Sequence, residues 1–416
     1  MPLFLIIALL VILSAIYSYI NARWLKLPGT IGIMTLAIIG SVLTIIVDRL
    51  NPSIADHLTV LAKNINFSTT VLNIMLGFLL FASAFNLDVR KLKREMRPVF
   101  ILSTLGVIVS TAIFGTLLYW VTGLIDIKIP YIYCLLFGAL VSPTDPVAVA
   151  AIIKGSKLPN NLETIISGES LFNDGIGLVL FITLLEITQS GTDNINFAKA
   201  AILFVQEVFG GIAMGAITGY LAFRLMKSID HFQTIVLVSL SLVMLNSVVA
   251  TLLHLSIPLA VVTAGLLAGG RSINVDNKDH SHQALEKFWT LIDELLNTML
   301  FVMIGLQMVN LPFIQNYWFT GAIGILILLG ARWLSIMLPL TFLRRSLNIN
   351  YNSINILTWA GLRGGISIAL ALALPASPYR HFILSGTYFI VIFSIIVQGL
   401  TLNRVINAAY KDNPKD

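Results

Sequence analysis

An apolar stretch with a polar centre determines how this chain folds: residues 131–153 read YIYCLLFGALVSPTDPVAVAAII. About 20 apolar residues are enough to cross the hydrocarbon core of a bilayer as an α-helix. Such a helix cannot continue through the centre, because Pro143 and Pro146 lack a backbone N–H and leave carbonyl groups in the preceding turn without partners. Asp145 stands between the two prolines. The stretch therefore predicts a membrane span that is broken around an acid.

The composition of the whole chain also indicates a membrane protein. Of its 416 residues, 57% are apolar and 11% are charged, whereas about 25% are charged in an ordinary soluble domain. These charges are too few to cover a soluble protein of this length, and the mean hydropathy of +0.90 suits a helical bundle in lipid. The single cysteine, Cys134, excludes an internal disulfide framework.

Long apolar runs predict an all-α polytopic protein with thirteen transmembrane helices. The first run lacks the basic start and the cleavage site of a signal peptide, so we interpret it as a span. The expected spans are residues 3–22, 30–48, 66–86, 98–122, 131–153, 162–187, 196–226, 232–254, 256–270, 285–309, 314–343, 352–374 and 381–403.

The positions of the basic residues predict the orientation of these spans. Of the 26 Lys and Arg residues, 19 fall in or beside odd-numbered loops and 5 in or beside even-numbered loops, while Arg332 and Arg363 lie inside spans. Basic residues accumulate in cytoplasmic loops. We therefore expect a multi-pass protein of the cell membrane, with its N-terminus outside and its C-terminus in the cytoplasm. The net charge of +6 is then explained by topology, and the basic run 90–94 is a juxtamembrane anchor, so no nucleic-acid partner is expected.

A second span is interrupted at a matching position. The twelfth span contains Gly361-Leu362-Arg363-Gly364-Gly365, where three glycines weaken the helix around a charge. Each of the first six spans corresponds to the span seven places later in the chain. Because seven is an odd number, the two corresponding spans cross the membrane in opposite directions. This pattern predicts two inverted repeats, at about residues 1–190 and 230–405, with discontinuous helices 5 and 12 crossing at one site, as in many secondary transporters. The span 196–226 would link them, and no soluble regulatory domain is expected.

The sixth span carries polar groups on two neighbouring faces. Ser170 and Asp174 are four residues apart and share one face, and Glu169 and Asn173 share the next. If the first face meets Asp145 and the carbonyl groups freed around Thr144, the result is a cage of oxygen ligands, which suits a small hard cation.

The same spacing suggests how such a site would exchange ions. On the second face Arg363 is expected to neutralise Glu169, which leaves Asp174 free to hold either a proton or a metal ion. Because Asn173 cannot ionise, one carboxylate would titrate in each cycle. The chain would then exchange one cation for one proton without moving net charge, and the loaded, neutral site would cross the membrane by alternating access. The transported ion would be the only metal, and no cofactor is expected.

Three motifs resemble those of the sodium/proton antiporters of the NhaP and NHE branch: Ser-Pro-Thr-Asp-Pro-Val-Ala-Val (142–149), Gly-Glu-Ser-Leu-Phe-Asn-Asp-Gly (168–175) and Trp-Ala-Gly-Leu-Arg-Gly-Gly-Ile-Ser (359–367). The resemblance extends over nearly the whole chain. It implies exchange of Na⁺ for H⁺ and a homodimer in which a core domain moves against a dimerisation domain.

The resemblance also implies roles for individual residues. Asp174 would be the main cation and proton carrier, helped by Asp145, Ser170 and the backbone of Thr144, and the supporting polar network would be Glu169, Asn173 and Arg363. Many relatives carry an acid in the third span, where this chain reads Phe-Ala-Ser-Ala-Phe (81–85). The sequence does not rank Na⁺ against Li⁺ or K⁺.

Two other function classes fit the sequence less well. Two aspartates on adjacent spans would suit an intramembrane aspartyl protease, but its Tyr-Asp and Gly-x-Gly-Asp signatures are absent, since Asp145 follows Thr144 and Asp174 follows Asn173. A channel would require more polar spans, and inverted halves favour alternating access. An antiporter is therefore the preferred hypothesis.

Overall fold

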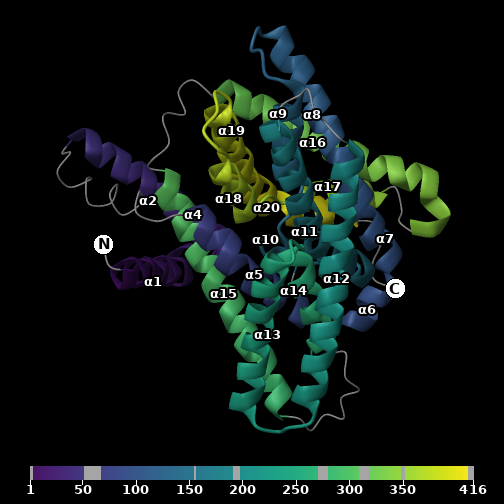
Figure 1. Cartoon of the computed structure of the whole chain (residues 1–416). Coiled ribbons are helices and arrows are strands. Elements are labelled where there is room, and N and C mark those ends of the chain that lie inside the picture. Colours follow the sequence, from purple (N-terminus) through teal and green to yellow (C-terminus); the bar gives the residue numbers. More distant parts are fainter. Residues whose placement is uncertain are drawn as a thin grey trace.

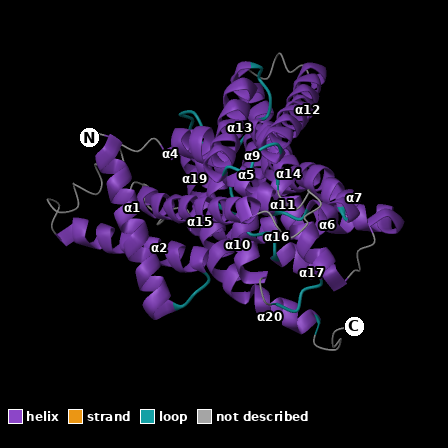
Figure 2. Ribbon diagram, turned by 90° about the horizontal axis from the view of Figure 1, so that it is seen from below, coloured by secondary structure: helices purple, strands orange, loops and turns teal. Residues whose placement is uncertain are grey.

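The structure is a computed structural model that describes residues 3–50, 67–153, 156–190, 197–269, 280–308, 318–347 and 352–410. The regular structure in these ranges is helical, and they contain no strand (Figure 2). Figure 1 places the long helix α11 (Asn160–Ser190) in the middle of the molecule. It contacts helices from both halves of the sequence.

The first half of the chain forms the following elements, of which η1, η2 and η3 are π-helical: α1 (Leu3–Ile20), η1 (Asn21–Leu25), α2 (Gly29–Leu50), α4 (Phe67–Thr69), η2 (Thr70–Met75), α5 (Leu76–Asn86), α6 (Val89–Arg94), α7 (Met96–Ile101), η3 (Leu102–Gly106), α8 (Val107–Leu124), α9 (Tyr131–Val141), α10 (Pro146–Ile153), α11 (Asn160–Ser190) and α12 (Phe197–Lys227).

The described residues of the second half form these elements, of which η7 is π-helical: α13 (Phe232–Leu252), α14 (Ile257–Ala268), α15 (His280–Met308), α16 (Trp318–Leu347), α17 (Asn352–Trp359), α18 (Gly365–Ala373), α19 (Arg380–Phe393), η7 (Ser394–Gln398) and α20 (Gly399–Ala409).

The helices agree with the expectation of a polytopic membrane protein. Every expected span contains helix that the structure describes. Within the described ranges, ten helical stretches are long and apolar enough to cross a bilayer. The apolar helices α9 and α14 are shorter, so the count of thirteen stays a prediction. The expected boundaries at residues 66, 196, 270, 309 and 314 lie outside the described residues.

Large apolar side chains also face outward, as expected for a protein in lipid. The exposed fraction is 81% for Phe4, 70% for Trp120, 85% for Leu124 and 82% for Phe342. Surfaces of this kind would be unfavourable in water but are compatible with the hydrocarbon core of a bilayer.

Both predicted interruptions are present, and they touch each other. The first separates α9 from α10 between Ser142 and Asp145, and the second separates α17 from α18 between Ala360 and Gly364. The backbone N–H of Asp145 donates to the carbonyl oxygen of Leu362 at 2.8 Å. Each interruption thus supplies a partner to a backbone group of the other. The crossing of the two helix pairs and the inverted repeat stay predictions.

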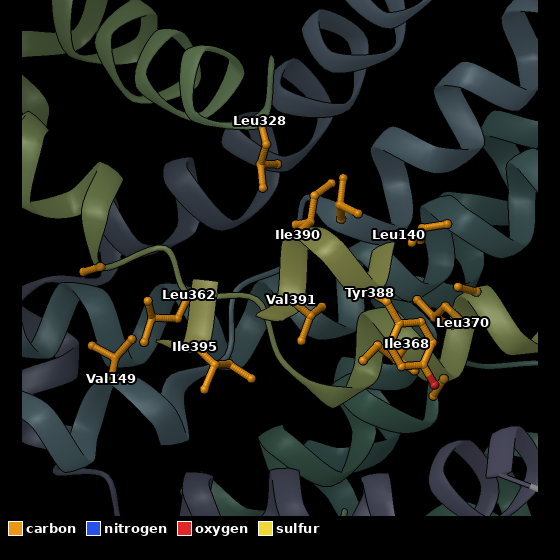
Figure 3. Close-up of a cluster of buried hydrophobic side chains, with 14 of the residues drawn as sticks. Leu140, Val149, Leu328, Leu362, Ile368, Leu370, Tyr388, Ile390, Val391 and Ile395 are labelled. Carbon is orange, nitrogen blue, oxygen red and sulfur yellow. The ribbon is translucent and has the colours of Figure 1, made fainter. Parts of the chain in front are cut away.

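A buried apolar core surrounds the two interruptions. Figure 3 shows side chains from the interrupted helices packed among those of α16, α19 and η7: Leu140, Val149, Leu328, Leu362, Ile368, Leu370, Tyr388, Ile390, Val391 and Ile395. This packing holds irregular backbone inside the protein, where it is shielded from lipid.

Candidate ion-binding site

Asp174 lies on α11 in the centre of the bundle. Its exposed fraction is 3%, and its Oδ2 atom has no hydrogen-bond partner among the described residues. The charges that act on this carboxyl group belong to Asp145 and Arg363. The next residue, Gly175, packs on α14, since an added methyl group there would lie 2.7 Å from Leu259 Cγ. Asp174 therefore offers a buried acceptor without a partner among the described residues.

Thr144, in the first interruption, joins α11 through three hydrogen bonds. Its hydroxyl lies 2.8 Å from that of Ser170 and accepts from Asn173 Nδ2 at 2.8 Å. Its backbone N–H, left free where the helix breaks, donates to Asn173 Oδ1 at 3.1 Å. The structure thus brings together Thr144, Ser170 and Asn173, three of the residues expected at the site.

The first interruption fits against α11 because a glycine faces it. A methyl group added to Gly177 would lie 2.2 Å from Pro143 Cγ, which is closer than two carbon atoms can approach. Only a residue without a side chain lets Pro143 reach the helix. This contact lies on α11 about one helical turn beyond Asp174.

Asp145 is half-buried and lies next to the N-termini of two helices, α10 and α18. It immediately precedes Pro146, the first residue of α10. Its carboxylate also rests on Gly364, which precedes α18, since an added methyl group would lie 1.9 Å from Asp145 Oδ2. Helix N-termini favour negative charge. Asp145 therefore lies where the starts of two helices favour a negative charge.

Arg363 is fully buried and binds the first interruption. Its Nη1 donates to the carbonyl oxygen of Ser142 and to that of Pro143, the latter at 2.8 Å. The carbonyl of Ser142 is the one that Pro146 leaves without a helical partner. Arg363 Nε and Nη2 have no hydrogen-bond partner within the described residues. The arginine of one broken helix thus satisfies carbonyl groups of the other.

The expected pair between Glu169 and Arg363 is wrong. Glu169 instead pairs with Arg332 of α16, whose Nη1 and Nη2 donate to its two carboxylate oxygens at 2.5 and 2.9 Å. Both side chains are buried. The helical spacing correctly separated Glu169 from the face of Asp174, but it could not show which span lies opposite. A signal was available, because Arg332 is also a charge in the middle of an apolar span and needs a counter-charge.

Sequence reasoning missed two residues that hold the second interruption. Ser394 Oγ accepts the backbone N–H of Arg363 at 2.8 Å and donates to Gln398 Oε1 at 2.7 Å. Gln398 Nε2 in turn donates to the carbonyl of Trp359 at 3.4 Å. Both residues are buried and belong to the π-helix η7. Two polar side chains four residues apart in an apolar span were the available signal.

The third span contributes no acid in this structure, in agreement with the sequence. Phe81 and Phe85 of α5 are buried against Trp289 of α15, with ring centroids 4.6 and 6.4 Å from the indole. The Trp289 Nε1–H donates to Ser239 Oγ at 3.2 Å. An aromatic cluster thus occupies this part of the third span.

The sequence is similar to those of known sodium/proton exchangers. The sequence profile described as "Sodium/hydrogen exchanger, transmembrane" matches residues 8–408. The chain is 39% identical to the Na⁺/H⁺ antiporter NhaP of Pseudomonas aeruginosa, over 98% of this chain and 97% of that protein. It is 29% identical to the Na⁺/H⁺ antiporter NhaH of Halobacillus dabanensis, over 96% of both chains.

A solved structure shares the fold. The sodium/proton antiporter MjNhaP1 of Methanocaldococcus jannaschii, determined at pH 8, superposes with a TM-score of 0.77. The match covers 98% of this chain and 99% of that chain at 20% sequence identity.

Proposed function

Since this chain belongs to the sodium/hydrogen exchanger family, as a relative of the NhaP antiporters, we propose that it exchanges Na⁺ for H⁺ across the cell membrane. It is a secondary transporter and not an enzyme, which sets the intramembrane protease aside. Li⁺ and K⁺ are alternative substrates of the same site. We further propose a homodimer whose N-terminus is outside and whose C-terminus is in the cytoplasm.

The buried carboxylate of Asp174 carries the proposal. One of its oxygens has no partner in the part of the chain that the structure describes, while the hydroxyl groups of Thr144 and Ser170 lie together at the first interruption. Oxygen ligands suit a small alkali cation. We assign the binding of Na⁺ or H⁺ to Asp174, with Asp145, Ser170 and the backbone of Thr144 as further ligands.

Asn173, Glu169 and Arg363 act as supporting residues in this proposal. Asn173 fixes Thr144, and Arg363 satisfies carbonyl groups of the first interruption. To these we add Arg332, which neutralises Glu169. None of the four supporting groups needs to bind the ion, because each has a partner within the protein.

The charges of this cluster favour an electroneutral exchange. Three acids and two arginines leave one negative charge when all are ionised: Asp145, Glu169 and Asp174 against Arg332 and Arg363. One H⁺ or one Na⁺ neutralises that charge. The loaded site is then neutral in either form, and the cost of moving it through the bilayer is lowest. Exchange of one Na⁺ for one H⁺ by alternating access follows.

Measurement of proton flux tests the proposed function. Proteoliposomes containing the purified protein receive NaCl, LiCl or KCl in turn while the internal pH is followed. We expect Na⁺ to drive proton movement that empty liposomes do not show. If none of the three ions moves protons, the protein is not an exchanger of alkali cations.

A further inference from the structure

A short helix between two spans presents a dense basic surface. The helix α6 connects α5, which ends at Asn86, to α7, which begins at Met96. Both neighbours belong to stretches apolar and long enough to cross a bilayer, so α6 lies where lipid headgroups are found. Five basic residues of this segment are exposed: Arg90, Lys91, Lys93, Arg94 and Arg97. We call these five residues the basic surface.

Few acids oppose the basic surface locally. Asp88 caps α6, because its Oδ1 accepts the backbone N–H of Arg90 at 3.0 Å and of Lys91 at 3.4 Å, and it lies 3.9 Å from Arg90 Nε. Glu95 is the other acid of the segment and is half-buried. The surface therefore keeps a clear excess of positive charge toward solvent and lipid headgroups.

The opposite side of α6 is fixed to the helix of the candidate site. Leu92 is the buried residue of α6, with an exposed fraction of 2%. It packs on Gly168 of α11, where an added methyl group would lie 2.7 Å from Leu92 Cδ1 and 3.0 Å from Val99 Cγ2. Gly168 immediately precedes Glu169, which holds Arg332. In Figure 1, α6 lies beside α7 at the edge of the molecule.

We propose that the basic surface binds anionic phospholipid headgroups and that this binding regulates ion exchange through the contact between Leu92 and Gly168. The surface combines clustered positive charge with a place at the membrane boundary, which is the combination that anionic lipids recognise. Headgroups that hold α6 in place also hold Leu92 on α11, next to the ion pair of Glu169. The regulatory part of this inference rests on the proposed exchange, and the binding part does not.

Lipid binding is tested on the whole protein in detergent. Phosphatidylglycerol or phosphatidylcholine is added, and native mass spectrometry counts the bound molecules. The test variant is Lys91→Gln/Arg94→Gln on α6, and the matched control is Arg224→Gln/Lys227→Gln, two exposed bases at the end of α12. We expect the test variant to bind phosphatidylglycerol about tenfold more weakly than the wild type or the control. Equal binding by both variants, or no preference for phosphatidylglycerol in the wild type, overturns the site.

Coupling to transport is tested in two lipid mixtures. Sodium-driven proton flux is compared in liposomes of phosphatidylcholine alone and of phosphatidylcholine with phosphatidylglycerol. We expect the anionic lipid to stimulate the wild type and the α12 control about fivefold, and the α6 variant much less. A third variant, Leu92→Ala, keeps every charge but loses the contact with Gly168.

The Leu92→Ala variant separates binding from regulation. It should bind phosphatidylglycerol as the wild type does and yet lose the stimulation. Full stimulation of Leu92→Ala, or of the α6 charge variant, contradicts the proposed coupling. If no protein shows flux in either lipid, the exchange itself fails, while the mass spectra still decide whether the basic surface binds the lipid.

Discussion

Arg332 and Glu169 form a buried ion pair with two parallel hydrogen bonds of 2.5 and 2.9 Å. The pair ties α16 to α11 five residues before Asp174, and it lies beside the second interruption. A methyl group added to Gly361 there would lie 3.0 Å from Arg332 Nε. The planar guanidinium fits both oxygens of a carboxylate, which a lysine cannot do. The helix that contains Asp174 is thus held by a contact to a span that is distant in the sequence.

Loss of Arg332 should destabilise the protein. In Arg332→Ala the buried carboxylate of Glu169 has no counter-charge, which costs about 3–5 kcal/mol. We expect a clearly lower midpoint of thermal unfolding. The double variant Arg332→Ala/Glu169→Gln should recover part of the loss, because it removes the unpaired charge. A single variant as stable as the wild type would show that the pair is not needed for folding.

A methyl group at Gly364 should displace Asp145. The added carbon of Gly364→Ala would lie 1.9 Å from Asp145 Oδ2, so the carboxylate must leave the start of α18. The φ angle of −117° is ordinary, which means that the effect comes from this contact and not from backbone strain. We expect a large loss of sodium-driven proton flux. The control is Gly330→Ala on α16, where an added methyl group has no neighbour within 4 Å; equal flux from the two variants would argue against the position of Asp145.

Ser394 should matter more for transport than another hydroxyl of the same span. Ser394→Ala leaves the buried N–H of Arg363 without its acceptor, at a cost of about 1–3 kcal/mol. We expect the apparent KM for Na⁺ to rise, because Arg363 is no longer held against the first interruption. Thr387→Val is the matched control, since the Thr387 hydroxyl donates only to the carbonyl of Ile383 in its own helix, at 2.7 Å. An unchanged KM in Ser394→Ala would exclude a positioning role.

Protons and Na⁺ should compete for one carboxylate. If both ions bind deprotonated Asp174, the apparent KM for Na⁺ rises about tenfold for each pH unit below the pKa of the carrier, while the maximal rate changes less. Initial rates over a series of Na⁺ concentrations and pH values measure this dependence. A KM that stays constant as the pH falls would mean that the two ions use separate sites.

The proposed stoichiometry predicts insensitivity to membrane potential. One Na⁺ exchanged for one H⁺ moves no net charge, so a potential imposed with valinomycin and potassium should leave the initial rate nearly unchanged. The experiment requires a prior demonstration that K⁺ is not transported. A rate that follows the imposed potential would rule out one-for-one exchange.

Much of the fold follows from local physical chemistry. Runs of about 20 apolar residues must be helical in lipid, because no water is available to the backbone. The prolines beside Asp145 and the glycines beside Arg363 interrupt their helices regardless of how those helices pack in the bundle. Both interruptions could therefore be predicted. The i, i+4 spacing likewise placed Ser170 and Asp174 on one side of α11. All of these inferences depend on residues that are close in the sequence.

Pairings between distant spans could not be predicted in the same way. Glu169 faces Arg332 because of how α16 packs on the bundle, and no local pattern gives that neighbour. Arg363 instead donates to two carbonyl groups of the first interruption. The roles of Ser394 and Gln398 depend on the position of η7 beside the second interruption. In each case a polar or charged residue in an apolar span indicates that a partner exists, and only the tertiary structure identifies that partner.

The proposed role of Asp174 as the carrier of both ions is tested most directly by sodium-driven proton flux of Asp174→Asn in proteoliposomes. Asparagine keeps the size of the side chain but can neither ionise nor release a proton. The control is Glu163→Gln, an exposed acid in the first turn of the same helix. We predict a folded protein without flux for Asp174→Asn and wild-type flux for the control. Flux of the wild-type size from Asp174→Asn would show that Asp174 is not the carrier.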